Sequence, residues 1–284
     1  MKRLAALILL FALLLSLSAC RGEDRVLSVG ILSDRLPLAA EGRNGYEGFE
    51  IEFCRKIAEE MGRRVEFRAV TAESGLAEVA SGGLDLVMGL GEDMTGSESV
   101  IRIGPYMLDR LVMVLPTDSA VTKAADLAGC RVVLRRGEGA ESFLAANPAL
   151  KNSFSSVVYT KDLYSAMLDI MVSDFDAALM SESEARWRIT SGKMKLSIAA
   201  ESLNGAGYPL YFAAAADNTL SGHVGNAIYA LSTAGELTAL SEKWFGADIF
   251  PSSEELRKSF GIILQEDAPQ AGEDAESFPG YGSL

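Results

Sequence analysis

Apolar and polar positions follow two periodicities along this chain, and each periodicity predicts a different kind of element. Short apolar runs are typical of buried strands, whereas apolar positions three and four residues apart are typical of amphipathic helices. From residue 26 onward the two kinds of segment alternate. The helix predicted over residues 48–61 is followed by Gly62, as glycine often follows a helix end.

The first part of the chain is predicted to form an α/β unit. Its strands and helices alternate over residues 26–32, 48–61, 64–70, 74–80 and 84–88. The order strand, helix, strand, helix, strand implies a parallel sheet whose crossover connections are right-handed.

The strand predicted over residues 84–88 ends in a glycine-rich, acidic turn. Gly89 and Gly91 let the backbone approach a ligand closely, and Glu92 and Asp93 place carboxylates beside them. In open α/β sheets, ligands bind at the carboxyl ends of the strands. The turn is therefore predicted to border a binding crevice, although an ordinary surface turn can have the same composition.

Two long apolar segments, 106–115 and 208–216, flank a second alternating unit. Within it, strands are predicted at 131–134, 156–159 and 177–180, and helices at 123–128, 140–146, 161–172 and 182–191. A helical region with a break near Gly235 follows. This arrangement predicts two α/β lobes joined by two crossover strands. Lobe 1 is assigned to residues 26–114 and 208–248, lobe 2 to 115–207, and a C-terminal extension to 249–284.

The C-terminal extension divides into two predicted parts. Residues 252–264 are predicted to contain a short helix with a serine cap. The acidic remainder, 265–284, contains glycine and proline but few aliphatic residues, and we expect it to be disordered.

The amino-terminal segment, residues 1–19, is predicted to be a signal peptide. Lys2 and Arg3 precede an apolar stretch, 4–17, which is too short to span a bilayer comfortably. The sequence Leu17-Ser18-Ala19-Cys20 resembles the lipobox of bacterial lipoproteins. That resemblance implies cleavage before Cys20 and acyl chains on its thiol, which would anchor the protein to the outside of the cell membrane. A plain secretory signal and an uncleaved anchor are the alternatives.

Charge and cysteine content restrict the classes of partner. The formal net charge of −13 argues against binding to nucleic acid or to an anionic membrane surface, since both need basic protein surface. Cys54 and Cys130 are expected to be unpaired and largely buried. No CxxC motif or Cys/His cluster supports a metal site, and no cofactor is expected.

Seven ordered segments together resemble the extracellular solute-binding proteins of the polar amino-acid family (family 3). They are Leu27-Ser28-Val29-Gly30-Ile31, Gly48-Phe49-Glu50-Ile51-Glu52, Ser81-Gly82 with Asp85-Leu86, Gly104-Pro105-Tyr106, Asp126-Leu127-Ala128-Gly129, Asp176-Ala177, and Gly235-Glu236-Leu237 with Glu242-Lys243-Trp244-Phe245-Gly246. The resemblance implies the type II periplasmic-binding fold. It also implies that the two lobes close around a small polar ligand and deliver it to an ABC-type permease, and we expect a monomer.

The resemblance also implies a set of ligand-binding residues at the edges of both lobes. These residues are Asp34, Leu38, Gly89, Leu90, Gly91, Glu92, Thr95, Gly137, Glu138, Ser181 and Glu182.

The chain departs from the family's amino-acid site at the positions that hold the ligand's charges. Glu98 stands where the T-x-x-R step of the family has a carboxylate-binding arginine, and Arg102 is either a substitute or a surface residue. Ser181 stands where an aspartate usually binds the ammonium group. Glu182 either takes over that role or stabilises a helix start. If two or more of the three acidic elements, Glu92/Asp93, Glu138 and Glu182, face the cleft, a carboxylate ligand is repelled and a cationic ligand such as a polyamine, a guanidino compound or a basic amino acid is favoured. The alternative is that these acids point to water, as charged residues usually do.

Two other functional classes fit the same sequence less well. A ligand-sensing receptor subunit would need a separate membrane partner. A dehydratase-like enzyme would use a cleft carboxylate such as Glu138 as its acid, but the single histidine, His223, belongs to no recognisable catalytic pattern. The sequence alone does not identify the ligand.

Overall fold

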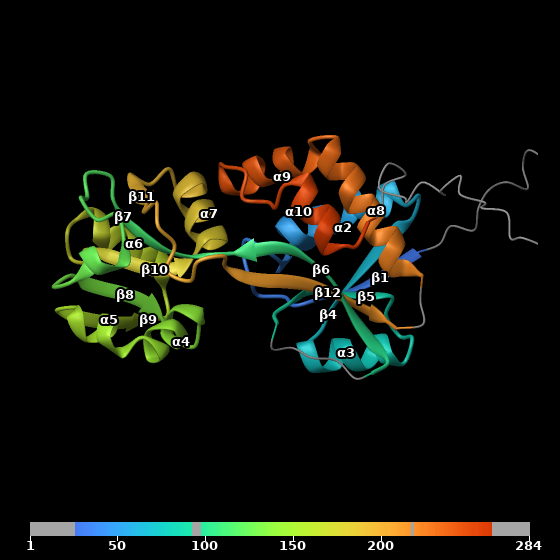
Figure 1. Cartoon of the computed structure of the whole chain (residues 1–284), viewed down its shortest axis with the longest axis horizontal. Helices are drawn as coiled ribbons and strands as arrows, with labels where there is room; N and C mark the ends of the chain where they lie inside the picture. The colour runs from blue at the N-terminus through green and yellow to red at the C-terminus, as the bar shows by residue number, and fades with distance from the viewer. Residues whose placement is uncertain (1–25, 93–97, 217–218, 263–284) are drawn as a thin grey trace, which may run out of the picture.

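The computed structural model describes residues 26–92, 98–216 and 219–262, which form two α/β lobes side by side (Figure 1). The predicted signal peptide, Cys20, Thr95 and the predicted disordered tail lie outside these ranges. Within the described ranges, every helix is too short or too polar to span a bilayer.

Lobe 1 is built on a five-stranded sheet in the order β4-β1-β5-β12-β6. Its strands are β1 (Val26–Ile31), β4 (Arg64–Ala69), β5 (Leu86–Leu90), β6 (Val100–Asp109) and β12 (Tyr208–Ala215). β1 runs parallel to β4 and β5, as predicted, whereas β12 is antiparallel to both of its neighbours. The sheet is therefore mixed, because the chain re-enters lobe 1 from lobe 2 in the opposite direction.

Helices cover both faces of the lobe-1 sheet (Figure 1). They are α2 (Phe49–Glu60), α8 (Leu220–Thr233), α9 (Glu236–Phe245) and α10 (Ser253–Ser259) on one face, and α3 (Ala72–Ala80) on the other. The predicted helical break near Gly235 is confirmed, because Gly235 adopts a left-handed conformation between α8 and α9. α10 starts at a capping box formed by Ser252 and Glu255, and its Leu256 is fully buried. This part of the C-terminal extension thus belongs to the lobe-1 core.

Lobe 2 repeats the layered arrangement around a second sheet, in the order β11-β7-β10-β8-β9. Its strands are β7 (Leu111–Pro116), β8 (Arg131–Arg135), β9 (Ser156–Thr160), β10 (Ala177–Ser181) and β11 (Leu196–Ile198). α6 (Leu163–Met171) and α7 (Glu182–Gly192) pack on one face. The 3-10 helix η1 (Ala124–Leu127), α4 (Gly139–Ala146) and α5 (Pro148–Ser153) pack on the other.

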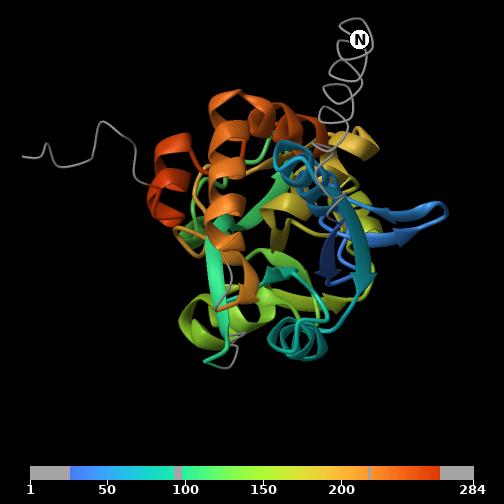
Figure 2. The same ribbon diagram turned by 90° about the vertical axis from the view of Figure 1, so that its right-hand side faces the viewer.

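Several short elements escaped the sequence analysis. They include α5, β11 and a hairpin of β2 (Ala40–Gly42) and β3 (Gly45–Glu47), which extends from the side of lobe 1 (Figure 2). Strands of three residues are too short to show a periodicity.

The chain passes from the first sheet to the second at Arg110. A single strand was predicted over residues 106–115, and this prediction is wrong, because β6 ends at Asp109 and β7 begins at Leu111. The Leu111 amide donates to Asn204 Oδ1 at 2.8 Å, and the Glu182 amide donates to the Arg110 carbonyl at 2.7 Å. These bonds turn the chain into lobe 2, so the predicted lobe boundary at 114/115 falls inside β7.

A second contact joins the lobes beside the crossover strands. Trp187 on α7 packs against the lobe-1 core, and the Thr190 hydroxyl donates to the Phe245 carbonyl at the end of α9. A Cβ atom at Gly246 would lie 2.6 Å from Thr190 Oγ1, so only glycine allows this approach. The two helices therefore touch where the two lobes meet.

Candidate ligand-binding site

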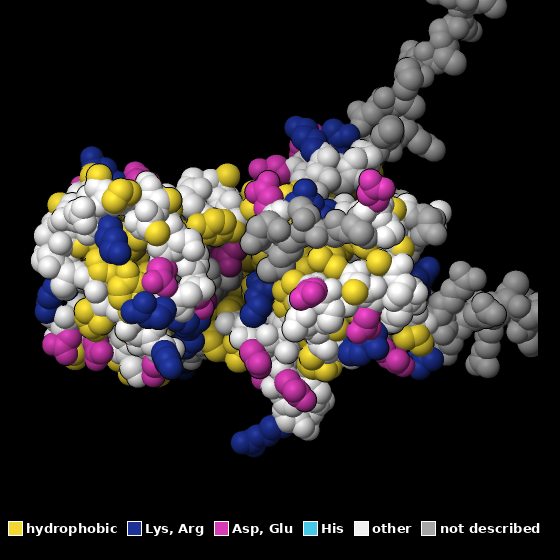
Figure 3. Space-filling model, turned by 90° about the horizontal axis from the view of Figure 1, so that it is seen from below, with side chains coloured by type: hydrophobic (Ala, Val, Ile, Leu, Met, Phe, Trp, Pro, Cys, Tyr) yellow, Lys and Arg dark blue, Asp and Glu magenta, His cyan; other side chains and the backbone are white. Residues whose placement is uncertain are grey.

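A cavity of about 940 Å³ lies between the lobes, at the end where the crossover strands join them. Figure 3 shows the hollow that separates the two lobes, with acidic and basic side chains at its border. The lining consists of Leu32, Asp34, Arg35, Leu36, Pro37, Leu38, Gly89, Gly91, Glu92, Asp109, Arg135, Gly137, Glu138, Gly139, Ser142, Ser181, Ser183, Glu184, Arg188, Tyr208, Pro209 and Leu210. Both lobes and both crossovers contribute, so one ligand can contact all of them at once.

Most of the predicted ligand-binding residues lie in this lining. Those that do are Asp34, Leu38, Gly89, Gly91, Glu92, Gly137, Glu138 and Ser181. Leu90 is instead buried in the lobe-1 core, and the side chain of Glu182 is bound by Arg110 and Arg186 at 2.5 Å and 2.7 Å. Thr95 is outside the described residues. Ligand contact by any of these residues stays a prediction.

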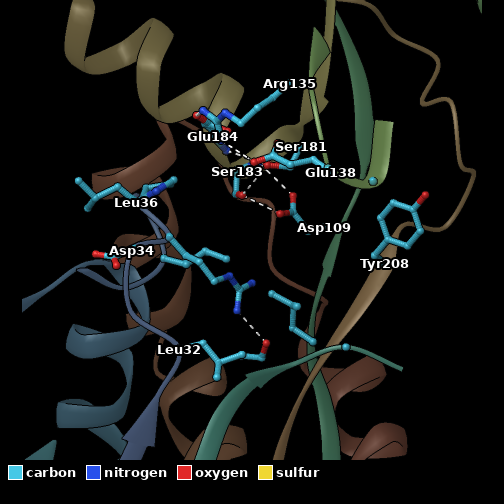
Figure 4. Close-up of a pocket in the computed structure, with 18 of the residues that line it drawn as sticks. Leu32, Asp34, Leu36, Asp109, Arg135, Glu138, Ser181, Ser183, Glu184 and Tyr208 are labelled. Carbon is cyan, nitrogen blue, oxygen red and sulfur yellow. Dashed lines mark hydrogen bonds and ion pairs between the residues drawn. The ribbon is translucent and has the colours of Figure 1, made fainter. Parts of the chain in front are cut away.

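Paired charges form the lobe-2 wall of the cavity (Figure 4). Arg135, the last residue of β8, contacts Glu138 Oε1 and Glu184 Oε1, each at 2.6 Å. Arg188, which lies one turn after Glu184 on α7, also contacts the Glu184 carboxylate, at 2.7 Å. Burial alone would lower the pKa of Arg135, but its hydrogen bonds to the two carboxylates outweigh burial and raise that pKa. These groups stabilise one another and fix the wall.

Asp109 is a different kind of carboxylate. It ends β6, is 8% exposed, and accepts hydrogen bonds from the Ser183 amide at 3.0 Å and the Ser183 hydroxyl at 2.7 Å (Figure 4). Within the described part of the chain it forms no ion pair. Burial raises the pKa of Asp109 to about 6, and the hydrogen bonds from Ser183 only partly oppose this.

Asp109→Asn is expected to remove a pH-dependent loss of stability. The folded-state pKa of about 6 lies above the ordinary value of 3.8, so the folded protein binds this proton more tightly than the unfolded chain. The free energy of unfolding therefore falls as the pH rises from about 4 to about 6, by about 2–3 kcal/mol. Asparagine keeps both bonds to Ser183, since a serine hydroxyl can also accept.

Chemical denaturation at pH 4.5 and pH 7.5 measures this effect. From pH 4.5 to pH 7.5 the free energy of unfolding of the wild type should fall by about 2 kcal/mol more than that of the Asp109→Asn variant. Because other carboxylates titrate equally in both proteins, the comparison isolates Asp109. The same stability difference at both pH values would contradict the assignment.

The lobe-1 wall is mainly apolar and carries one arginine. Leu32, Leu36, Pro37, Leu38 and Leu210 supply the apolar surface. Arg35, in the loop after β1, donates from Nη1 to the Gly89 carbonyl at 2.8 Å. Beneath it, Glu50 is fully buried on α2 and accepts a 2.5 Å hydrogen bond from the Tyr106 hydroxyl. Burial raises the pKa of Glu50, whereas Arg35 and Tyr106 lower it in part.

Several charged, hydroxyl-bearing or aromatic lining residues were not among those expected from the sequence. These are Arg35, Asp109, Arg135, Ser183, Glu184, Arg188 and Tyr208. Two of them had a usable signal, because Asp109 interrupts a long apolar run and Arg135 ends a predicted strand. Arg102, considered as a substitute arginine, is not in the lining; it donates to the Glu92 carbonyl and lies over the Tyr211 ring.

Two cysteines, Cys54 and Cys130, lie in the described ranges. Both are free thiols, as expected; Cys54 is buried, which raises its pKa to about 12, whereas Cys130 is only half-buried, contrary to the expectation. Among the residues that the structure describes, no three histidine, cysteine or acidic side chains gather as a metal site.

Comparison with known proteins identifies the family to which this chain belongs. The family model for bacterial extracellular solute-binding proteins, family 3, matches residues 27–247. The L-cystine-binding protein TcyJ of Escherichia coli (strain K12) is 25% identical over 234 residues, which cover 80% of this chain and 85% of TcyJ. The virulence sensor protein BvgS of Bordetella pertussis is 30% identical over 115 residues, 39% of this chain and 9% of BvgS.

Solved structures show the same fold. The substrate-binding protein of a polar amino acid ABC uptake transporter from Streptococcus thermophilus has a TM-score of 0.72 and 21% identity, covering 82% of this chain and 90% of its own. The L-cystine solute receptor of Neisseria gonorrhoeae, in its unliganded open conformation, has a TM-score of 0.66 and 21% identity. The match covers 81% of this chain and 96% of the receptor chain. The predicted type II periplasmic-binding fold is thereby confirmed.

Proposed function

Because this chain belongs to the bacterial extracellular solute-binding proteins, family 3, we propose that its cavity captures an amino acid or a related small amine. Members of this family bind solutes outside the cytoplasm and work with ABC-type permeases. Closure of the two lobes around the ligand is part of the proposal, since a ligand that contacts both walls would favour a closed state over an open one. A lipid anchor on Cys20 and a monomeric state are part of the proposal, and the mass of the mature amino-terminal peptide tests the anchor.

Asp109 is the observation that carries the choice of an amine. The other buried carboxylate of the lining, Glu184, already has two arginine partners, whereas the Asp109 side chain is bound, within the described ranges, by Ser183 alone. A buried carboxylate without a cation is unfavourable, and an ammonium or guanidinium group would supply the missing charge. Asp109 lies where β6 leaves lobe 1 and contacts α7 of lobe 2, so a cation there would draw on both lobes.

The charge of the whole lining supports the same choice. It contains five carboxylates, those of Asp34, Glu92, Asp109, Glu138 and Glu184, against the three arginines Arg35, Arg135 and Arg188. Of the three acidic elements expected to favour a cation, Glu92 and Glu138 face the cavity and Glu182 does not. Glu138 and Glu184 are paired with arginines, and Asp34 and Glu92 are exposed to solvent, so the attraction for a cation centres on the buried Asp109.

A thermal-shift screen followed by calorimetry tests this function. The panel contains L-cystine, L-histidine, L-arginine and L-glutamine, with the decarboxylated amines cystamine, histamine and agmatine. A bound compound raises the unfolding temperature by mass action. For the tightest compound, Asp109→Asn should lower the affinity about 30-fold or more, because the charge partner is lost. Asp118→Asn, at an exposed position outside the lining, is the matched control.

The pH dependence gives a second readout. Below about pH 6 Asp109 binds a proton in the ligand-free protein. The ratio of the wild-type affinity to that of Asp109→Asn should therefore fall as the pH is lowered, at a rate that approaches about tenfold per pH unit. Equal affinities of the two proteins at pH 7.5 would overturn the role of Asp109. If no amine or amino acid in the panel binds, the proposed ligand class is wrong.

A sensory role is the second candidate, favoured by the partial match to BvgS. Uptake of the bound compound by cells lacking the protein separates the two. Loss of uptake supports transport, whereas unchanged uptake supports a receptor that reports ligand binding to a separate membrane protein.

A further inference from the structure

Arg35 is the cationic side chain that lobe 1 contributes to the described cavity lining. The other two arginines, Arg135 and Arg188, belong to lobe 2 and are already paired with carboxylates. Arg35 forms no direct ion pair among the described residues. Among the described residues its side chain makes one hydrogen bond, 2.8 Å from Nη1 to the Gly89 carbonyl, which fixes the guanidinium group and leaves its other N–H donors available to a ligand.

Glu50 faces Arg35 from beneath, across Gly89. A Cβ atom at Gly89 would lie 2.7 Å from Arg35 Nη1 and 3.1 Å from Glu50 Oε2, so the absence of a side chain lets the two charged groups face each other. Glu50 is fully buried. Its Oε1 accepts from Tyr106, and its Oε2 has no hydrogen-bond partner among the described residues.

Few other titratable groups surround this pair. Cys54, on the same helix as Glu50, is buried and holds its proton, since its pKa is about 12. Tyr106, on β6, also holds its proton, because burial and the neighbouring Glu50 raise its pKa. Asp109 is close enough for the Arg35 charge to lower its pKa slightly. Arg35 is therefore the positive charge that favours the ionised form of Glu50.

We propose that Arg35 binds the carboxylate of an amino-acid ligand, and that Glu50 takes up a proton from solvent when it does. The inference rests on the proposed amino-acid function and adds the ligand's second charge. A guanidinium group holds a carboxylate through two parallel hydrogen bonds. Once the ligand's negative charge neutralises Arg35, the buried carboxyl of Glu50 loses the positive charge that favours its ionised form, and burial then favours a proton on Oε2.

This assignment accounts for the departure at the T-x-x-R step. Glu98 occupies the arginine position, and Arg102 is directed to the Glu92 carbonyl and the Tyr211 ring instead of the cavity. The loop after β1 supplies the positive charge from another direction. An amino acid then spans the cavity, with its carboxylate on Arg35 and its ammonium group at Asp109.

Calorimetry on matched pairs tests the proposal. The probes are L-cystine with cystamine, L-histidine with histamine, and L-arginine with agmatine, using the pair whose amino acid binds most tightly. Arg35→Met should lower the affinity for the amino acid about 100-fold and leave the affinity for the amine nearly unchanged. Arg102→Met, the same substitution in an arginine outside the lining, should change neither. Arg35→Lys should give an intermediate loss, and it serves if Arg35→Met does not fold.

Proton uptake is measured at pH 7.5 by comparing binding enthalpies in phosphate and Tris, which differ in ionisation enthalpy. The wild type should take up protons with the amino acid and not with the amine. Glu50→Gln should still bind the amino acid but without proton uptake. Equal affinity of the wild type for both members of the pair would overturn the role of Arg35 while leaving the amine-binding function intact. Undiminished uptake in Glu50→Gln would overturn the role of Glu50.

Discussion

Phe53→Ala is expected to lower the free energy of unfolding of lobe 1 by about 3–5 kcal/mol. Phe53 lies on α2 and is fully buried. Its ring centroid is 5.8 Å from that of Phe49, 5.6 Å from Tyr106, 6.0 Å from Phe212 and 5.3 Å from Phe250. Alanine would leave a cavity among four rings that come from different parts of the chain and cannot all move inward.

Urea denaturation followed by tryptophan fluorescence measures this loss. Trp187 and Trp244 both pack against the lobe-1 core, so their emission reports its unfolding. Phe53→Leu is the matched control and should cost less than about 1.5 kcal/mol, because most of the volume is kept. A loss below about 1 kcal/mol for Phe53→Ala would show that the aromatic cluster can collapse around the gap.

Arg135→Met should destabilise lobe 2 by about 3 kcal/mol and weaken ligand binding with it. Methionine keeps much of the length of the side chain but removes the charge that holds Glu138 and Glu184. The side chain of Glu184 is only 7% exposed, so water cannot replace the lost partner, and Arg188 alone remains to compensate. Glu138, at 39% exposure, can instead turn to solvent.

Chemical denaturation tests the loss, with Arg136→Met as the matched control. Arg136 is the next residue, its side chain is 66% exposed, and its contact with Glu141 is 3.6 Å long. The control should cost less than about 1 kcal/mol, as exposed ion pairs do. If the two variants are equally stable, the Arg135 network is no stronger than a surface pair and the wall of the cavity is not held by it.

The sequence predicted the order of the elements well, because apolar periodicity is a local property. Glycine-rich strand ends also placed the cavity correctly at the end of β5. The face to which each side chain points was harder to predict. Gly89 lines the cavity, yet Leu90 packs with Val87 on the other face of the sheet, because the left-handed backbone of Gly89 (φ 83°) interrupts the regular alternation of the strand. Similarly, Glu182 and Glu184 stand two positions apart on α7 and face different arginines.

The charges of the site depend on contacts between distant segments, which no local pattern shows. Arg35 and Glu50 face each other only because Gly89, from a third segment, leaves room between them. Asp109 becomes a cavity residue because β6 ends at the turn into lobe 2, inside what the sequence presented as one strand. Its raised pKa is a consequence of burial, which follows from the assembled fold.

The place of β12 in the lobe-1 sheet sets an order of assembly during synthesis. β12 lies between β5 and β6, although it follows them by more than ninety residues. All five strands of the other sheet are complete once Ile198 has been made, whereas β6 has no neighbour in its sheet until residues 208–215 emerge. A growing chain therefore cannot finish its first lobe early. The last strand of the lobe-1 sheet, and with it the partner of β6, is thus supplied only after every strand of the other sheet.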